Sequence, residues 1–307
     1  MTTTSIQPVE EIKKGLFHTP FWLAPEQDIF AKRAVRFQEL AQEDNSDWCA
    51  YLTLLAAVCK AQQTVSERHD FPPPELYQGE TVLLAAEQSQ VPSEFFAVFT
   101  DLLNEVNGNI TATAAQETAK LKALPQEATE ALAQRVLSHS TTAADKAAVI
   151  WVQAALQIIW TAWAAQLTED HVPPIEERTH CPCCSTEAVG SVILIKGDLA
   201  GFRYMHCPLC NSRWNVLRAK CPTCGDAGHM RLQQVEADSA PDLASAYRGA
   251  YAESCTSCES YRKLYRQDKQ QYADPVADDL ATLGLDIAVG EAGFDRGGAN
   301  PFLLLGE

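Results

Sequence analysis

Cys181-Pro-Cys-Cys184 is the first of four Cys-x-x-Cys pairs, which continue with Cys207-Pro-Leu-Cys210, Cys221-Pro-Thr-Cys224 and Cys255-Thr-Ser-Cys258. Two intervening residues let one tight turn direct both sulfurs at one point, and two such turns form a tetrahedral four-thiolate site. The alternative is a set of disulfides or unpaired turns, but such arrays in a reducing compartment are typical of metal binding. The pattern therefore predicts two metal centres, with the ligands Cys181, Cys184, Cys207, Cys210, Cys221, Cys224, Cys255 and Cys258.

The order in which the pairs combine follows from the strands predicted between them. We expect the first pair to join the second and the third to join the fourth, because each of these couples encloses a predicted hairpin. The enclosed loops have 22 and 30 residues. A nested arrangement would close longer loops at a slightly higher cost in entropy, and a crossed arrangement is the other alternative.

The ligand set does not separate iron from zinc, because four thiolates in tetrahedral geometry accept either metal. Cys221-Pro-Thr-Cys224-Gly225 matches the turn that holds iron in rubredoxin, although zinc ribbons use the same turn. We therefore expect two metal ions in four-cysteine sites, with iron favoured and zinc as the alternative. A closed four-thiolate site leaves no coordination position for a substrate, so we expect a protein that is not an enzyme.

The formal charge of the 307-residue chain is −16, from 24 basic and 40 acidic residues. The charge is uneven, since residues 1–177 carry 11 basic and 24 acidic side chains and residues 178–307 carry 13 and 16. Nucleic-acid affinity comes largely from Lys and Arg that neutralise phosphates. The composition therefore argues against a nucleic-acid partner.

Two segments bear on localisation. Residues 1–14 lack the apolar core and small-residue cleavage site of a secretory signal, so we expect a cytoplasmic protein, whose thiols stay reduced. Ala147–Leu167 is uncharged and long enough to span a membrane. However, Gln153, Gln157 and Thr161 share one face of a helix there, and no positive flank orients a span. We expect a central core helix and no membrane span.

Helical periodicity dominates the first half of the chain, after an extended arm at 1–25. The predicted helices cover 28–43, 48–66 with Asp47 as N-cap, 75–90, 93–106, 113–122, 126–139, and a last one from 141 or 142 to about 170. Short polar joints between these helices indicate an all-α domain.

The periodicity changes after the Pro173-Pro174 linker. Strands are predicted at 188–195, 202–206 and 212–217, then at 230–235 and 245–251 around a loop at 237–243. Each half of this region has the order of a rubredoxin or zinc ribbon, and neither half has enough apolar residues to fold readily without metal.

A short helix is predicted around Tyr261, Leu264 and Tyr265. A longer one begins at Asp274-Pro275 with Asp as N-cap and Pro at the first helical position. Its predicted buried stripe and its stop are Val276, Leu280, Leu283, Ile287 and Gly290. The tail from 296 to 307 is predicted to be irregular.

The predicted fold is therefore α+β and multidomain. Residues 1–172 form an all-α helical domain, 173–220 and 221–270 form two tandem rubredoxin-like or zinc-ribbon modules, and 271–307 form a C-terminal helix and tail that pack on the modules.

Several other side chains with reactive groups are expected to be neither metal ligands nor catalytic residues. Cys184 is preferred to Cys183 as a ligand, by analogy with the other pairs, which leaves Cys183 as a bystander. The histidines near the pairs are expected beside the ligands or in solvent, namely His180, His206 and His229. Cys49 and Cys59 are expected to pack as small apolar groups. Asp278 and Asp279 suit the positive end of a helix better than an acid/base pair.

Further segments resemble the FdhE family of formate dehydrogenase accessory proteins. They are Cys181-Pro-Cys-Cys184, Gly201-Phe-Arg-Tyr-Met-His-Cys207, Trp214 with Arg218 and Lys220, Glu253-Ser-Cys255, Ala277-Asp-Asp-Leu-Ala-Thr-Leu-Gly-Leu-Asp286 and Arg296-Gly-Gly-Ala-Asn-Pro-Phe302. The resemblance is close over 178–307 and general over the N-terminal helices. Cys183 departs from the commoner Cys-Pro-x-Cys form.

The resemblance implies a cytoplasmic accessory protein for the assembly of respiratory molybdenum- or tungsten-dependent formate dehydrogenase. It implies association with iron and binding of the catalytic subunit of formate dehydrogenase before export. One alternative is a rubredoxin-type electron carrier, which would require iron because zinc is redox-inert. A less favoured alternative is a zinc-ribbon nucleic-acid binder, since residues 203–269 have a net charge of only +3 from 10 basic and 7 acidic side chains.

Overall fold

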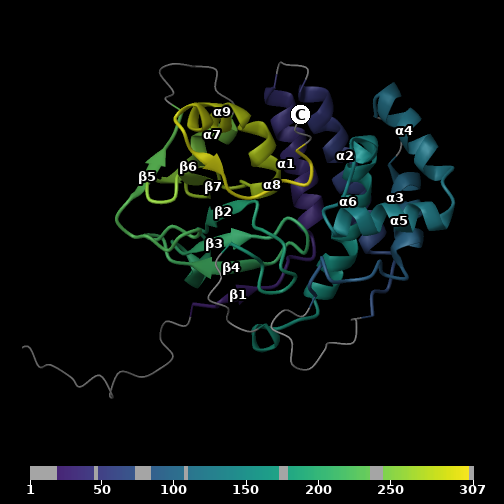
Figure 1. Ribbon diagram of the computed structural model, residues 1–307, viewed down its shortest axis with the longest axis horizontal. Coiled ribbons are helices and arrows are strands. Elements are labelled where there is room, and N and C mark those ends of the chain that lie inside the picture. The colour runs from purple at the N-terminus through teal and green to yellow at the C-terminus, as the bar shows by residue number, and fades with distance from the viewer. Residues whose placement is uncertain are drawn as a thin grey trace, which may run out of the picture.

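The N-terminal half of the chain folds as helices whose apolar faces meet around α6. The computed structural model describes residues 19–44, 48–72, 84–106, 110–172, 179–235 and 245–303. Its first helices are α1 (Ile29–Glu43), α2 (Trp48–Ser66), α3 (Phe95–Glu105), α4 (Ala112–Lys122), α5 (Gln126–Leu137) and α6 (Lys146–Ala164), with 3-10 turns η2 (Ala143–Asp145) and η3 (Glu169–His171). Figure 1 shows the strands on one side of α1 and the helices α3–α6 on the other.

Most of the helical predictions agree with this structure, with two corrections. Residues 84–90 form turns rather than the end of a helix, and the last predicted helix ends at Ala164 instead of near 170. Other predicted features lie outside the described residues: the N-cap at Asp47, residues 75–83, the Pro173-Pro174 linker, most of the arm, the loop at 237–243 and the end of the tail.

Helix α6 is the central element of the helical layer, as its composition predicts. Ala143–Ala164 is the one stretch among the described residues that is long and apolar enough to cross a membrane, and 78% of its apolar window is buried inside the fold. The polar residues of α6 also have partners, because Gln157 accepts from Gln62 and donates to the Pro208 carbonyl at 2.8 Å. α6 is thus a core helix whose polar face holds a cysteine loop.

A single mixed sheet occupies the other side of α1. Its described strands are β1 (Trp22–Leu23), β2 (Gly190–Ile193), β3 (Arg203–His206), β4 (Arg213–Val216), β5 (Met230–Gln233), β6 (Ala250–Cys255), β7 (Ser260–Arg266) and β8 (Asp295–Arg296). The order is β1-β4-β3-β2-β7-β6-β5, and β8 pairs with β7. The remaining elements are η4 (Gly197–Leu199), α7 (Ser245–Gly249), α8 (Pro275–Ala281) and α9 (Leu283–Glu291).

The two cysteine-bearing halves are joined within this sheet. β2 pairs in parallel with β7, with Ser191 opposite Leu264 and Ile193 opposite Arg266. The strands β2, β3 and β4 come from the first predicted module, and β5, β6 and β7 come from the second. The fold class is the predicted α+β class, and the two halves share one continuous hydrogen-bonded layer. The domain boundaries stay a prediction.

Three predictions in the second half were wrong. Residues 245–249 form the helix α7, and the strand β6 begins only at Ala250. Tyr261, Leu264 and Tyr265 belong to the strand β7 rather than to a helix. The C-terminal helix is divided at Thr282 into α8 and α9, so Gly290 lies inside α9 and Ile287 is 64% exposed.

Gly298 lets the C-terminal segment lie against Ala188, shortly after the turn that holds Cys181 and Cys184. Its φ is +89°, and a Cβ at this position would overlap the carbonyl oxygen of Ala188. We expect Gly298→Ala to lower the free energy of unfolding by about 2 kcal/mol or more, because the backbone is strained and the carbonyl must move. In α9, a Cβ at Gly290 meets nothing within 4 Å, so Gly290→Ala should be neutral or stabilise by up to about 1 kcal/mol. Urea denaturation of both variants checks this, and equal effects would contradict it.

Candidate metal centres

Each Cys-x-x-Cys pair lies in a turn that ends in a left-handed residue. The residue after each second cysteine has positive φ: Ser185 (64°), Asn211 (57°), Gly225 (78°) and Glu259 (55°). Only Gly225 adopts this region without a steric cost. The first turn of each half is also closed in the same way, since Ser185 N donates to Cys181 O and Gly225 N donates to Cys221 O, both at 2.9 Å. The left-handed residue therefore recurs at all four turns, and the two cysteines of each pair lie in one four-sulfur group.

The strands then bring the turns together two by two. In the first half, β2 and β3 are antiparallel with Gly190 opposite His206, which places Cys207 next to the turn at 181–184. In the second half, Met230 of β5 lies opposite Cys255 of β6. The result is two groups of four sulfurs, each within 4.8 Å of one another, and they combine in sequence order as predicted.

The sulfur separations fit a tetrahedral metal site. Cys181 Sγ lies 3.6 Å from Cys210 Sγ and Cys184 Sγ lies 3.4 Å from Cys207 Sγ, whereas in the other group the corresponding distances, 221 to 258 and 224 to 255, are 3.8 and 3.7 Å. A tetrahedron with metal–sulfur bonds of about 2.3 Å has edges of about 3.8 Å. All eight cysteines are free thiols rather than disulfides. The donor set and its spacing therefore suit iron or zinc.

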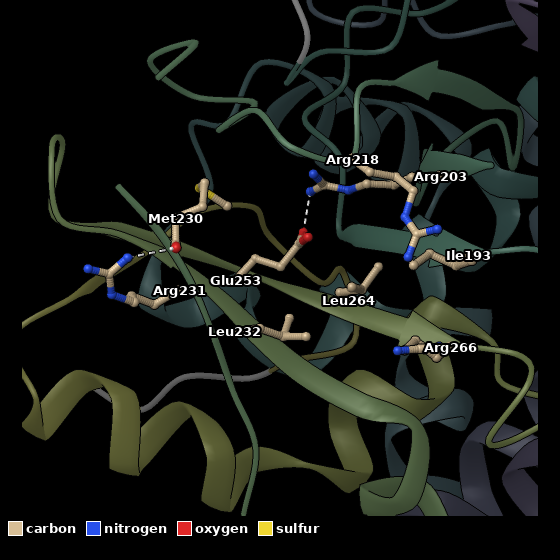
Figure 2. Close-up of a pocket in the computed structure, with 9 residues that line it drawn as sticks. All are labelled: Ile193, Arg203, Arg218, Met230, Arg231, Leu232, Glu253, Leu264 and Arg266. Carbon is tan, nitrogen blue, oxygen red and sulfur yellow. Dashed lines mark hydrogen bonds and ion pairs between the residues drawn. The ribbon is translucent and has the colours of Figure 1, made fainter. Parts of the chain in front are cut away.

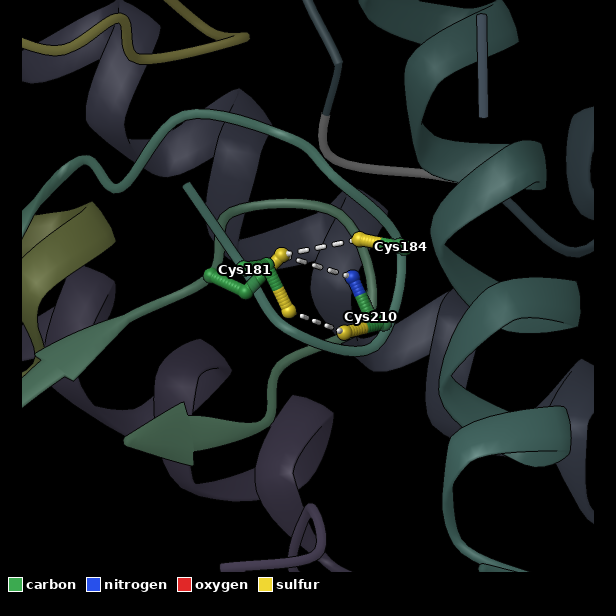
Figure 3. A group of neighbouring side chains, drawn as sticks. Cys181, Cys184 and Cys210 are labelled. Atoms are coloured by element: carbon green, nitrogen blue, oxygen red, sulfur yellow. Dashed lines mark hydrogen bonds between the residues drawn. The ribbon is translucent and has the colours of Figure 1, made fainter. Parts of the chain in front are cut away.

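The first group is enclosed in the core. All four of its cysteines are buried, and Figure 3 shows the thiols of Cys181, Cys184 and Cys210 turned toward one another. Ser212 Oγ lies 3.0 Å from Cys210 Sγ. Although burial raises the pKa of the Cys210 thiol, hydrogen bonds from neighbouring thiols outweigh it and lower the pKa to about 6. A lowered thiol pKa favours the thiolate, which is the form that binds metal.

The second group is close to the surface. Cys221 and Cys255 are buried, but Cys258 is half-buried and Cys224 is exposed. Burial again raises the pKa of Cys258, and hydrogen bonds from Ser260 and neighbouring thiols lower it to about 7. The two groups have the same donors and differ in solvent access.

The turn segment 84–90 forms hydrogen bonds to the backbone of the first cysteine group. Leu84 N and Ala86 N donate to the carbonyls of Cys183 and Cys184 at 2.9 and 3.0 Å. Cys184 belongs to the four-sulfur group, as predicted, and Cys183 is a buried neighbour whose backbone N donates to Cys181 Sγ at 3.4 Å. These contacts fix the turn at both the sulfur and the carbonyl side.

The histidines and the remaining cysteines lie outside both groups. His206 is fully buried, and burial lowers the pKa of its ring to about 3, so the ring is neutral. His180 is half-buried, and exposed His229 lies 3.0 Å from Asp226. Cys59 is buried, and burial raises its pKa to about 12, which agrees with apolar packing. Cys49 is half-buried against the same core.

Asp278 agrees with the predicted place at a helix N-terminus, because its carboxylate accepts from the backbone N of Asp274, the N-cap of α8. Both Asp278 and Asp279 are also fully buried in ion pairs, which was not predicted. Asp278 Oδ1 lies 2.6 Å from Arg36 Nη2 of α1. Asp279 lies 3.1 Å from Lys263 Nζ of β7 and 2.7 Å from Arg296 Nη2. Asp279 follows Val276 by three residues, so it falls on the predicted buried stripe of the helix. This position was the one sign in the sequence that the Asp279 side chain is buried.

The buried side chain of Arg33 connects α1 to the first cysteine group and to α8. Arg33 is fully buried; its Nε lies 3.0 Å from Asp274 Oδ1 and its Nη2 donates to Asn211 Oδ1 at 2.7 Å. Asp274 caps α8 as predicted, since it accepts from the backbone N of Val276 and Ala277. Arg33 therefore joins α1, the left-handed residue of a cysteine turn and the N-terminus of α8.

Three parts of one protein family match the chain almost from end to end. They are described as "FdhE, N-terminal" over residues 19–177, "FdhE, central domain" over 180–218 and "FdhE, C-terminal domain" over 219–303. The chain belongs to the FdhE family. The boundary between its central and C-terminal parts falls between the two cysteine groups.

Individual relatives agree with FdhE membership. A "Protein FdhE homolog" from Haemophilus influenzae (strain PittEE) is 34% identical over 285 residues, which cover 92% of this chain and 90% of the relative. One from Actinobacillus pleuropneumoniae serotype 3 is 32% identical and covers 97% and 98% of the two chains. The crystal structure of the FdhE protein from Pseudomonas aeruginosa superposes with a TM-score of 0.77 at 28% identity, covering 94% of this chain and 100% of that one.

Proposed function

We propose that this FdhE protein is a cytoplasmic maturation factor that binds the catalytic subunit of formate dehydrogenase and holds two metal ions at its eight paired cysteines. Family membership supports the role in formate dehydrogenase maturation. The observation that carries the proposal is the pair of complete four-sulfur groups in this fold. Four protein donors close the coordination sphere, so a metal bound there stabilises structure or exchanges an electron and leaves no position for a substrate.

The partner can be tested directly. The tagged protein, purified without oxygen, should retain the separately expressed catalytic subunit of formate dehydrogenase on an affinity resin. Deletion of the gene should lower formate dehydrogenase activity in the cell, and the wild-type gene should restore it. Failure to retain the subunit, together with full activity in the deletion strain, would refute the maturation role.

Solvent access favours electron transfer as a second candidate function. Cys224 is exposed and Cys258 is half-buried, so a metal held there would lie close to the surface, where a redox partner can approach. This role requires iron, since zinc has no accessible redox change. Metal analysis of the anaerobically purified protein decides between the two, because zinc in both sites would exclude electron transfer.

The same difference in access predicts the order of metal loss. A hydrophilic chelator should remove metal from the second group at least about tenfold faster than from the first, because all four sulfurs of the first group are buried and metal must be released there through local unfolding. Native mass spectrometry during chelation should pass through a species with one metal. Simultaneous loss of both ions would show that the fold opens as a unit.

A further inference from the structure

The face of the sheet opposite α9 carries a pocket beside the second cysteine group. Alternate residues of β7 point to opposite faces, and Tyr261 and Tyr265 pack with Leu285 and Val289 of α9. Leu264 and Arg266 therefore point to the other face, where they line a pocket of about 180 Å³ (Figure 2). We call it the arginine pocket, after its lining residues Arg203, Arg218, Arg231 and Arg266.

The carboxylates around the arginine pocket balance only part of its positive charge. Glu253 forms an ion pair with the fully buried Arg203. Arg266 Nη2 lies 2.8 Å from Asp268 Oδ2. The pocket is thus lined by four guanidinium groups and one carboxylate, that of Glu253, and Asp268 outside the lining pairs with Arg266.

Arg218 and Arg231 form no ion pair within the part of the chain that the structure describes. Both side chains are exposed, and among the described residues their guanidinium groups donate only to carbonyl oxygens, those of Gly201 at 3.3 Å and Met230 at 3.2 Å. Planar guanidinium groups bind carboxylates through two parallel hydrogen bonds. In a chain of net charge −16, acidic groups are repelled by most of the surface and attracted to this place.

The size of the pocket limits what can enter. A volume of about 180 Å³ is smaller than the roughly 300–1,000 Å³ of sites that enclose drug-sized ligands. The wall is partly apolar, because Ile193 and Leu264 contribute to it together with Leu232, which is 52% exposed. These features suit one acidic side chain whose neighbours in the same segment cover Leu232.

The adjacent strand offers a backbone for such a segment. β5 is the last strand in the sheet order, and among the described strands only β6 pairs with it. An extended peptide can add to an open sheet edge through main-chain hydrogen bonds, while pockets beside the edge select its side chains. Arg231 and Leu232 belong to this edge strand, so the edge and the pocket are contiguous.

We propose that the arginine pocket binds a carboxylate side chain from an extended acidic segment of a partner polypeptide, which pairs with the free edge of β5. This inference rests on the proposed function, and the partner is the unfinished catalytic subunit. Met230 lies opposite Cys255 in the β5–β6 pair. The segment would therefore lie directly beside the more exposed metal site.

Reversal of the unpaired charges tests the proposal. The double variant Arg218→Glu/Arg231→Glu should bind the isolated catalytic subunit at least about tenfold more weakly than wild type in a surface-binding assay, since attraction becomes repulsion. The matched control is Arg248→Glu, an exposed arginine of α7 outside the pocket, which should change the affinity less than about twofold. Unchanged metal content and circular dichroism would show that both variants fold.

A second variant separates charge from geometry. Arg218→Lys/Arg231→Lys keeps the positive charge and loses the bidentate fork, so its affinity should fall between those of wild type and the charge reversal. If wild type binds and the charge reversal binds equally well, the inference is wrong and the proposed function stands. If wild type fails to bind, the proposed binding of the catalytic subunit is wrong, and the inference is wrong with it.

Two other occupants would also overturn the inference. A wild-type dimer that the charge reversal dissociates, measured by light scattering, would assign the pocket to a second copy of this acidic chain. Tight binding of a single-stranded RNA oligonucleotide, lost in the charge reversal, would assign it to phosphates. Monomeric wild-type protein without RNA binding supports the acidic segment.

Discussion

Replacing Cys207 and Cys210 by serine should remove one metal ion and a large part of the stability of the fold. Both side chains are fully buried in the main apolar core. The free energy of metal binding in such sites is largely free energy of folding, and buried serine hydroxyls would add unsatisfied polar groups. We expect the free energy of unfolding to fall by about 5 kcal/mol or more, and Tm to fall by roughly 10–20 °C.

The matched variant is Cys255→Ser/Cys258→Ser in the second group. Cys258 is half-buried and its group lies at the surface, so the loss of stability should be less than half as large. Metal content by mass spectrometry and thermal denaturation by circular dichroism check both variants. Each should keep one metal ion and the spectrum of the intact site. Loss of both ions from a variant that remains folded would contradict two independent four-cysteine sites.

The second large effect is expected at the buried carboxylate Asp279. Asp279→Asn would remove one of the two carboxylates that Lys263 and Arg296 share, and would leave both cations to Asp286 in a site where Asp279 has no solvent exposure. Removing one partner of a buried ion pair typically costs about 3–5 kcal/mol, and we expect a loss of about 3 kcal/mol because Asp286 still neutralises part of the charge. The control is Asp268→Asn, because Asp268 also pairs with an arginine but its side chain is 40% exposed. The control should cost less than about 1 kcal/mol.

The pH dependence of Asp279 gives a second measurement. Burial alone would raise the pKa of this carboxyl, but Lys263 and Arg296 hold it below its ordinary value. A folded pKa below the unfolded value of about 3.9 means that this stabilisation is complete above pH 4 and is lost at lower pH. Urea denaturation of Asp279→Asn should therefore show a weaker loss of stability below pH 4 than wild type. An unchanged pH profile would mean that Asp279 does not titrate in this range.

The cysteine sites could be predicted from the sequence because their geometry is local. Two residues between cysteines define each turn, and the strand between the turns returns the chain to its starting point. Gly225 also signals the left-handed residue that ends a turn, although Ser185, Asn211 and Glu259 do the same without a glycine. The difference in burial between Cys184 and Cys224 was not predictable from the sequence. Leu84 and Ala86, which are distant in sequence, form hydrogen bonds to the turn that contains Cys184.

The errors share a different cause, namely contacts between residues far apart in sequence. Tyr261, Leu264 and Tyr265 have the spacing of a helix, but β7 lies between β2 and β6 and is buried on both faces, so apolar residues occur at neighbouring positions. Lysine is normally exposed, so Lys263 would be expected at the surface. In the structure it lies in the core, where Asp279 and Asp286 neutralise its charge. A single sequence offers no sign of these partners, so it predicted the two four-cysteine groups and missed the ion pairs between β7, α1 and α8.

The parallel pairing of β2 with β7 has a consequence for synthesis on the ribosome. β2 and β3 can form their hairpin early, but the other edge of β2 has no partner until Ser260–Arg266 has been translated. Until then the nascent chain presents an unpaired, apolar strand edge, and such edges promote association between chains. Early metal uptake by the first cysteine group would stabilise this hairpin until β7 is made, so the supply of metal would influence how much of the protein reaches its folded form.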